Sequence, residues 1–525
     1  MALAIYAVLS EPKIVENFAI RVADLTPIGP PANLVTLSLL SKTCYNTLRD
    51  DCFPVVSAEV FQRSFAMSAL RRRLGQLSPS DIAAELPRRF TSLKIIKSGS
   101  LDDPGLRDAL MRVYFMLLED DGVNAAQIAW SNLSETLDNI LRRSLQKEVN
   151  TDKEVTALAI VLFSIVSQSM SDAELDGQAI HDLLAPYAFC SFQCPLSAEI
   201  PERYFYPPQK LPTQERGIFF PASHYILYFG HSLRYNTPPV AAYAIQAYLA
   251  KYETNPLKVP DKHPFRRTVA ELPSLPGVTM TFLEEDNAKS SRLRKRTHSN
   301  PSQQYDLIWR RVTSSSDVDR HPPSLCLHHE LGALSGSWHG VSLVPDMFFD
   351  LSDSIRRLYR LPIQCRLREH YCLNMADMAP VVQGESGYLN AWLPLGCKFL
   401  ETSEGLTIQE ANGQRVAQYR TFDRARKSRT RRASCEPVDI ILTGETDAEH
   451  SSAWGAFNFY GRVRPSDGFI ILVRHPDDSA YNGFGRDVFR GYMLSSQHIV
   501  GRRRYAFPEA KASYEMLWNL RSEVE

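Results

Sequence analysis

The first part of the chain carries apolar residues at helical spacing. Ile14, Val15 and Phe18 follow Pro12. Proline is favoured in the first turn of a helix, because the N–H that it lacks would have no hydrogen-bond partner within the helix there. After a proline-rich break, residues three and four apart predict a second amphipathic helix: Leu34, Leu37, Leu40, Cys44 and Leu48. Two or three short helices within residues 1–53 make a small module, which we expect to lean on a partner or on the next domain.

Helical periodicity continues over residues 54–285. Three apolar stripes there, beginning at Leu106, Leu133 and Val155, have the spacing of buried helix faces. We therefore predict a helical middle domain, packed as a bundle or as an array of helical pairs. The stretch 189–238 is rich in proline and aromatic residues, and we expect it to wind over the helices.

The pattern changes after residue 323 to short apolar or alternating runs separated by Gly, Pro, Asp and Asn. Six such runs are Trp338–Val344, Cys365–Leu373, Val438–Thr443, Ala456–Val463, Phe469–Val473 and Val488–Leu494. Pro465-Ser466-Asp467-Gly468 lies between two of them and is typical of a hairpin turn. The pattern predicts an antiparallel β-barrel or sandwich over residues 324–510, followed by a C-terminal tail, 511–525. The fold class is therefore multidomain α + β.

Composition and charge narrow the function classes. At about 150 residues per domain, 525 residues allow three to four domains. The chain has 59 Lys+Arg and 59 Asp+Glu, and this balance argues against a dedicated nucleic-acid or membrane-surface protein. Basic residues nevertheless concentrate at 292–296, in a predicted flexible linker spanning 286–323, and at 424–432, in a predicted long loop. Each run is either a nuclear-import signal, a docking loop for an acidic partner, or a solvated loop.

The cysteines and the apolar segments indicate the compartment. Nine cysteines are scattered along the chain, an odd number that is typical of a reducing, intracellular setting. The N-terminal apolar residues lack the basic region of a signal peptide, and the longest apolar stretch, Val155–Val166, is too short to span a bilayer. We expect a cytoplasmic or nuclear protein, or one found in both compartments.

The sequence shows no catalytic constellation. In Gly336-Ser337-Trp338-His339-Gly340 the serine is off-centre, so this is not a nucleophile elbow. Cys190 and Cys194, and the run Cys326-Leu327-His328-His329, hold zinc-type ligands without the paired spacing of a zinc site. Glu119-Asp120-Asp121 follows a helical stripe and is interpreted as a solvated helix end. We therefore predict a non-enzymatic protein with no cofactor and no metal.

The N-terminal module resembles an F-box. The resemblance is carried by Leu9–Phe18 and by Pro30–Cys44, in which Asn33-Leu34 stands where the family has an Asp-Leu pair. The spacer Ile20–Pro31 departs from the family in its length and its proline content.

The C-terminal region resembles another known domain. An ordered series of motifs carries the resemblance: Gly336–Gly340, Leu389–Gly396, Leu442–Thr446, Ser452–Gly455, Tyr460–Val463, Phe489–Tyr492 and Val500–Arg502. Together with Met111–Gly122, the series resembles F-box proteins of mushroom-type fungi. Their C-terminal domain is similar to the lipocalin-like, cyclin-D-binding-type barrel of some animal F-box proteins.

These resemblances imply a function. The F-box would bind a Skp adaptor that docks on a cullin, and the other domains would recruit an unknown protein substrate for ubiquitin transfer. The chain would then be a non-catalytic receptor subunit that contacts neither nucleic acid nor membrane. The residues assigned to the adaptor contact or to the module's own core are Leu9, Pro12, Ile14, Val15, Leu34, Leu37 and Leu40.

The barrel motif leaves two interpretations open. Its residues are either structural or substrate-binding: Trp338, Gly340, Trp454, Gly455, Gly461, Arg490 and Gly491. An alternative function is a small-ligand carrier with a lipocalin-like barrel and a degenerate F-box, which a lumen filled by side chains would count against. A third is a hydrolase, which a Ser or Cys within hydrogen-bond reach of a His would favour.

Overall fold

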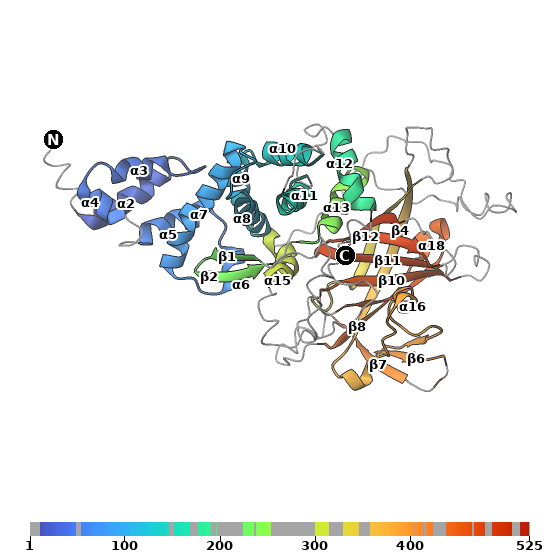
Figure 1. Ribbon diagram of the computed structural model, residues 1–525. Helices are drawn as coiled ribbons and strands as arrows, with labels where there is room; N and C mark the ends of the chain where they lie inside the picture. The colour runs from blue at the N-terminus through green and yellow to red at the C-terminus, as the bar shows by residue number, and fades with distance from the viewer. Residues whose placement is uncertain are drawn as a thin grey trace. The chain divides into compact units, whose positions relative to one another are not determined.

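A computed structural model describes most of the chain. It covers residues 11–48, 54–145, 152–167, 177–190, 196, 224–235, 238–253, 300–313, 329–345, 358–403, 405–411, 413, 416–423, 437–464, 467–477, 486–506 and 515–523. Contacts divide the chain into two compact units (Figure 1). The first comprises Met1–Leu183, Ala222–Pro238 and Thr297–Ser316, and the second comprises Leu184–Pro221, Pro239–Arg296 and Asp317–Glu525.

Three short helices begin the first unit: α2 (Pro12–Ala23), α3 (Ala32–Ser38) and α4 (Lys42–Leu48). The prediction of two or three short helices is confirmed, and Pro12 stands in the first turn of α2. The prediction of one continuous second helix is wrong, because the chain breaks between α3 and α4. Ser41 makes the break: its side-chain Oγ accepts the N–H of Cys44 at 3.0 Å, as a helix-capping residue does.

Seven helices follow in the described part of the first unit: α5 (Pro54–Ser64), α6 (Ser68–Leu74), α7 (Pro79–Ser98), α8 (Leu106–Leu118), α9 (Asn124–Trp130), α10 (Leu133–Leu145) and α11 (Lys153–Ser167). The three predicted stripes lie on α8, α10 and α11, and most of their described leucines are buried, including Leu110, Leu137 and Leu162, whereas Leu117 is half-buried. Helix α7 packs against both α5 and α8. The helical middle region is therefore built around α7, as a packed set of helices.

Two further pieces of the first unit were not foreseen. The hairpin of β1 (His224–Tyr228) and β2 (His231–Tyr235) lies in the stretch expected to wind over the helices. The turn η3 (Pro301–Tyr305) and the helix α15 (Asp306–Thr313) lie in the expected linker, so that expectation is wrong for 300–313. Helix α15 buries Leu307 and Trp309, and both Arg72 and Arg73 donate hydrogen bonds to Asp306. The basic run 292–296 lies outside the described residues.

The second unit contains an antiparallel barrel. Eight of its described strands form a ring in chain order: β3 (Gly336–Pro345), β4 (Leu358–Cys372), β8 (Asp439–Glu445), β9 (Phe457–Val463), β10 (Ile470–Pro476), β11 (Asp487–Ser495), β12 (His498–Tyr505) and β13 (Met516–Ser522). The ring closes because β3 pairs with both β13 and β4. The predicted antiparallel barrel is confirmed. The predicted tail 511–525 is corrected, because it contains the closing strand β13.

Several elements cover the barrel wall. A small sheet of β5 (Lys398–Glu401), β6 (Gly405–Gln409) and β7 (Val416–Thr421) branches from the end of β4. Helix α13 (Val240–Glu253) lies against β11, β12 and β13 (Figure 1). It was expected in the middle domain, but it groups with the barrel. At the end of α12 (Gly177–Phe189), Arg502 of β12 donates hydrogen bonds to the carbonyls of Ala188 and Tyr187 at 2.6 and 2.7 Å.

Strand register assigns alternate residues to the two faces of the barrel wall. One set faces outward: Arg502 meets α12, and Tyr460 of β9 stacks on Phe399 of β5. The other set faces the lumen, and large side chains fill it, among them Trp338, Leu472, Phe489 and Trp518, each at most 2% exposed. Among the helices that the structure describes, none is both long and apolar enough to cross a membrane.

Candidate protein-docking site

The core of the α2–α4 module is small. Val15 and Ala19 of α2, Leu37 of α3 and Cys44 of α4 are buried at its centre. These side chains come from positions three to four residues apart or from facing helices, as helix packing requires. Of the residues assigned to adaptor contact or to the core, Val15 and Leu37 therefore lie in the core. Leu34 is half-buried, and Leu9 lies outside the described residues.

The same module exposes an unusual number of large apolar side chains, on its helices and between them. Leu39 is 76% exposed and Leu40 is 58% exposed, and Ile14 and Phe18 lie one turn apart on α2. We call the full set the docking surface: Ile14, Phe18, Leu25, Ile28, Val35, Leu39, Leu40 and Tyr45. Single exposed apolar residues are ordinary, but a concentration of them in one small module is typical of an interaction site. Pro12, also predicted here, is exposed at the start of α2.

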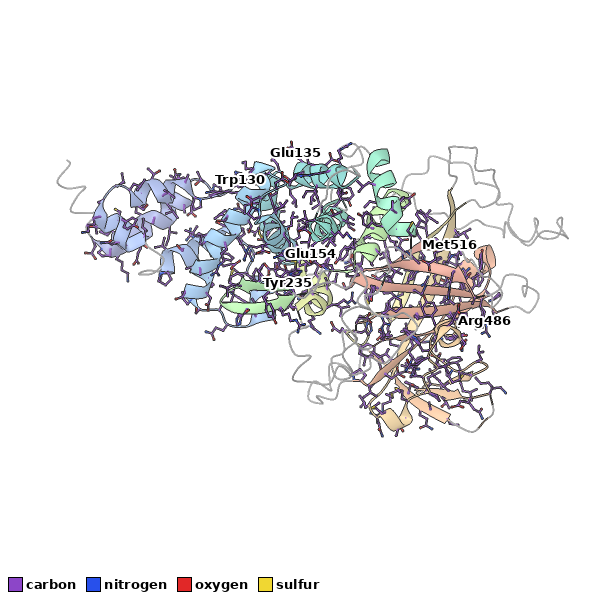
Figure 2. The ribbon with its side chains drawn as sticks, viewed as in Figure 1. Trp130, Glu135, Glu154, Tyr235, Arg486 and Met516 are labelled. Atoms are coloured by element: carbon purple, nitrogen blue, oxygen red, sulfur yellow. The ribbon has the colours of Figure 1, made fainter. Side chains whose placement is uncertain are left out.

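The proline-rich spacer between α2 and α3 attaches this module to the larger helical body. The N–H of Gly29 donates to Oε1 of Gln127 at 2.8 Å, and Nε2 of Gln127 donates to the carbonyl of Pro27 at 2.7 Å. Gln127 is buried on α9; its bond to Gly29 is shielded from water and its bond to Pro27 is partly shielded. Trp130, labelled in Figure 2 at the end of α9, lies against Gly29, where an added Cβ would be 2.7 Å from the indole ring.

Gly29 is required at this position for two reasons. Its φ of 82° lies in the left-handed region, which disfavours residues with a Cβ, and the Trp130 ring occupies the space that a Cβ would need. The spacer, which departs from the F-box pattern in length, is therefore an anchor. It holds the docking surface in a defined orientation on α9.

The predicted barrel-motif residues do not converge on one site. Trp338 points into the lumen and donates from Nε1 to the carbonyl of Leu334 at 2.7 Å. Gly340 and Gly461 face the lumen from β3 and β9 by register. Gly491 also does, and an added Cβ there would lie 3.0 Å from Cζ2 of Trp518. These positions have a structural role, since an added Cβ at each would meet a backbone carbonyl of the neighbouring strand: that of Asn519 at Gly340, of Ile471 at Gly461 and of Val500 at Gly491.

The remaining motif residues lie elsewhere. Arg490 faces outward, pairs with Glu515 and stacks over the Tyr388 ring, 5.1 Å from its centre. Gly455 ends α18 (Ala448–Trp454) with a φ of 97°, and the side chain of Trp454 lies outside the described part of the structure.

A buried charged cluster in the first unit was missed. Nη2 of Arg89 lies 2.6 Å from Oε2 of Glu119, and the hydroxyl of Tyr228 donates to Oε1 of Glu119 at 2.6 Å. All three residues are buried, so the interpretation of Glu119 as part of a solvated helix end is wrong. Burial raises the pKa of Tyr228 well above its ordinary value, which keeps its proton on the bond to Glu119. A signal was present: Arg89 falls at helical spacing between the core residues Leu86 and Leu93.

The other two acidic residues of that run have partners as well. Oδ1 of Asp120 accepts the N–H groups of Gly122 and Asn124 at 2.9 and 2.8 Å at the start of α9. Oδ1 of Asp121 accepts the N–H of Ser302 at 2.9 Å and so ties η3 to the helices. All three acidic residues of the run therefore accept hydrogen bonds that hold parts of the first unit together.

Two histidine contacts bear on the hydrolase alternative. Oγ of Ser495 lies 3.1 Å from Nδ1 of His498, across the turn between β11 and β12, which is the kind of contact that this alternative needs. The second is a cluster on the barrel wall. Nε2 of His370 lies 2.8 Å from Oγ1 of Thr443, which donates to Oε2 of Glu401 at 3.0 Å, and Nδ1 lies 3.0 Å from Oγ1 of Thr421. Burial lowers the pKa of His370 to about 4, so the ring is neutral at pH 7. Thr443 is itself buried and already donates its proton to a carboxylate. These hydrogen bonds join β5 and β7 to β4 and β8, and we call the group the histidine clamp.

The described residues offer no prearranged metal centre, since no three His, Cys, Asp or Glu side chains among them are placed to hold an ion. Cys190 is exposed, and His329 bonds to Glu369, with Nε2 3.2 Å from Oε2. Cys194, Cys326 and His328 lie outside the described residues, as does the basic run 424–432.

No family model, curated protein or solved structure matches the chain. A function must therefore be argued from the residues themselves. The docking surface and its anchor on α9 are the features that the fold does not otherwise explain.

Proposed function

We propose that the chain is the substrate-recognition subunit of a Skp–cullin–F-box ubiquitin ligase. Helices α2–α4 are the F-box and bind a Skp adaptor, which links the chain to a cullin. The C-terminal barrel, of the lipocalin-like, cyclin-D-binding type, recruits a protein substrate. The chain itself carries out no chemistry in this proposal.

The observation that supports it is the docking surface. Eight large apolar side chains are exposed on or between three helices whose own core is small. Covering such side chains is favourable by about 25 cal/mol for each Å² of apolar surface removed from water. A helical partner that accepts these side chains in a groove would supply that cover.

The anchor on α9 supports the same proposal. Ubiquitin transfer needs a substrate held at a set position relative to the ligase, because an effectively intramolecular reaction depends on orientation. A docking module joined to the helical body through two hydrogen bonds to the buried Gln127 meets this need better than one on a flexible tether.

The lumen counts against the small-ligand carrier as the main function. Trp338, Trp518 and Phe489 occupy it, and barrels that carry large ligands keep that space open. A protein substrate would instead be recruited by the barrel exterior or its loops.

Co-purification of the full chain with a Skp adaptor tests the proposal. The informative variant is Leu39→Asp combined with Leu40→Asp, because both residues are exposed and their loss spares the module's core. Leu37 is 3% exposed, so a charge there would unfold the module and would not report on binding. The matched control is Leu400→Asp, at a site 55% exposed on β5 of the other unit.

We expect the wild type and the control to retain the adaptor and the double variant to lose it. Two leucines, each largely buried on binding, contribute about 2–4 kcal/mol. Since about 1.4 kcal/mol is tenfold in affinity, the variant should bind about 30- to 700-fold more weakly. Failure of the wild type to bind, or equal binding by the double variant and the control, would overturn the assignment.

A further inference from the structure

The outer wall of the barrel carries four arginines on two neighbouring strands. Arg490 of β11 lies directly opposite Arg502 of β12, and Arg504 is the next outward residue of β12. Arg486 immediately precedes β11, where its carbonyl accepts the N–H of Ala506 at 2.6 Å, so strand alternation places it on the same outer face. Like charges on facing positions of a sheet are destabilising, so this grouping needs an explanation beyond strand pairing.

The fold itself uses two of the four arginines. Arg490 forms an ion pair with Glu515, and Arg502 donates to the end of α12 while its Nε lies 3.7 Å from Oε2 of the same carboxylate. Both arginines are buried. Their charges are therefore compensated by Glu515 and by the carbonyl end of a helix, where a positive charge is favourable.

The other two arginines lie against one short segment at the surface. The guanidinium of Arg504 lies 5.1 Å from the centre of the Tyr388 ring, at the end of α16 (Glu385–Tyr388). Nη1 of Arg486, a residue labelled in Figure 2, lies 3.4 Å from Oδ1 of Asn390, two residues further along the chain. Arg486 is exposed and Arg504 is half-buried. The same segment therefore positions both guanidinium groups while leaving part of each side chain open to solvent.

Among the described residues, no carboxylate forms an ion pair with Arg486 or Arg504. Glu385 begins α16 and is exposed, and it too has no described ion pair. Asp477 accepts a hydrogen bond from a side-chain amide of β9 at 2.7 Å, and Asp487 pairs with an arginine of β10 on the lumen side of the wall. The described part of this face therefore presents two guanidinium groups that the fold does not neutralise.

The chemistry and the spacing of these groups specify an acidic peptide. The N–H donors of a guanidinium lie in its plane, so contact with a ring face or a single hydrogen bond leaves further donors for carboxylates. Arg486 and Arg504 occupy diagonal positions of an antiparallel pair, about 7–8 Å apart. Side chains on one side of an extended peptide repeat at about 7 Å, so two of its carboxylates match this spacing. The Tyr388 ring is 2% exposed and cannot stack on a nucleobase, as binding of single-stranded nucleic acid requires.

We propose that the outer wall around Arg486 and Arg504 docks an acidic segment of a protein substrate. The segment is extended, and carboxylates two residues apart in it accept hydrogen bonds from the two arginines. The word substrate rests on the proposed function, but the docking uses only the barrel unit and requires no adaptor. The surface lies outside the wall, so it is compatible with a lumen filled by side chains.

Fluorescence polarisation of a labelled hexaglutamate peptide with the full chain tests this surface, with hexaglutamine and a single-stranded hexathymidylate as comparisons. The chain has 59 basic and 59 acidic residues, so its overall charge gives a polyanion no general attraction. We expect hexaglutamate to bind, more weakly as the ionic strength rises, and hexaglutamine not to bind. Absence of hexaglutamate binding, or equally tight binding of hexathymidylate, would overturn the proposal.

A pair of variants assigns the binding to these arginines. Arg486→Gln combined with Arg504→Gln should weaken hexaglutamate binding about tenfold, since each exposed ion pair contributes up to a factor of about five in affinity. The matched control is Arg366→Gln combined with Arg420→Gln, which removes the same charge from exposed arginines of β4 and β7. The control should bind as the wild type does. Equal weakening by both pairs would overturn the proposal, because the peptide would then respond to charge alone.

Two further measurements separate docking from a structural role and from the proposed function. The double variant should have the same Tm as the control, because neither Arg486 nor Arg504 has a described ion pair to lose. A lower Tm together with unchanged peptide binding would show that the two arginines only stabilise the fold. A chain that binds the Skp adaptor but not hexaglutamate would contradict this inference alone, whereas one that binds hexaglutamate but not the adaptor would contradict the proposed function alone.

Discussion

Replacing Glu119 by alanine removes the counter-charge of a guanidinium that has no access to water. The Arg89 side chain is 0% exposed, as is that of Glu119, and the rings of Phe61 and Phe65 lie within 5 Å of the guanidinium. Removing one partner of a buried ion pair lowers the free energy of unfolding by about 3–5 kcal/mol, because the remaining charge stays buried without a counter-charge. We expect Glu119→Ala to lower the free energy of unfolding of the helical unit by that amount.

The control is an exposed ion pair in the same unit. Arg63 lies 2.7 Å from Asp24, and their side chains are 42% and 39% exposed. Surface pairs contribute about 0–1 kcal/mol, so Arg63→Ala should change the stability by no more than that. Urea unfolding followed by circular dichroism at the helical band measures both variants, with an unchanged m-value confirming that stability alone has shifted.

A second variant distinguishes charge burial from packing. The pair Arg89→Met with Glu119→Leu replaces both charges by apolar side chains, which is often neutral or stabilising when the volume is kept. We expect the double variant to recover most of the loss of Glu119→Ala. If Glu119→Ala cost no more than Arg63→Ala, the reasoning about this cluster would be refuted.

Two further predictions concern the clamp and the anchor. The pKa of His370 is about 4 in the folded chain against an ordinary value of 6.5, so the unfolded chain takes up the proton first as the pH falls. This difference in pKa contributes on the order of 3 kcal/mol to the free energy of unfolding above pH 6.5, and the contribution is lost as the pH falls towards 4. His370→Gln should therefore reduce the pH dependence of the free energy of unfolding in this range, as measured by urea unfolding. An unchanged pH dependence would contradict the assignment. Gln127→Ala leaves the N–H of Gly29 and the carbonyl of Pro27 without their partner, at a cost of about 2–4 kcal/mol. Hydrogen exchange at Gly29 should accelerate in the variant while exchange in α7 is unchanged, and equal protection of Gly29 in the wild type and the variant would show that the anchor does not depend on these bonds.

The sequence predicts the elements of this fold better than their ends. The spacing of Leu106, Leu110 and Val113 marks α8 because a buried helix face repeats at 3.6 residues. Strands β9 and β10 are equally visible, since a turn sequence separates two apolar runs. Strand β13, with seven residues, is as long as β9 and β10, but it fell in the predicted tail. Only the pairing that closes the ring, with β12 on one side and β3 on the other, reveals its place.

Buried charge was the main source of error. Glu119 looked solvated because acidic residues usually are, and its partners Arg89 and Tyr228 lie 30 and 109 positions away in the chain. Helix α15 was not predicted from the sequence for a related reason. Its surroundings have the composition of a linker, and its four buried apolar residues stand beside charged ones that bind other helices.

The candidate site shows the same limit. Periodicity placed Ile14 and Val15 on one predicted helix and Leu37 and Leu40 on a second, but it could not separate the core from the surface. Val15 and Leu37 are buried, whereas Ile14 and Leu40 are exposed. Leu40 leaves the predicted pattern because the second helix ends at Ser38 and α4 begins only at Lys42. The resemblance to an F-box named a partner, and the structure supplies the residues with which to test it.

Hydrogen exchange of the full chain, with and without a purified Skp adaptor, tests the central claim most directly. The account predicts a one-to-one complex in which amides of α2 and α3, which carry Phe18 and Val35, and the amide of Leu39 just after α3 become protected. The barrel strands should exchange as before. Absence of a complex, or protection confined to the barrel, would contradict the proposal that this surface is the adaptor site.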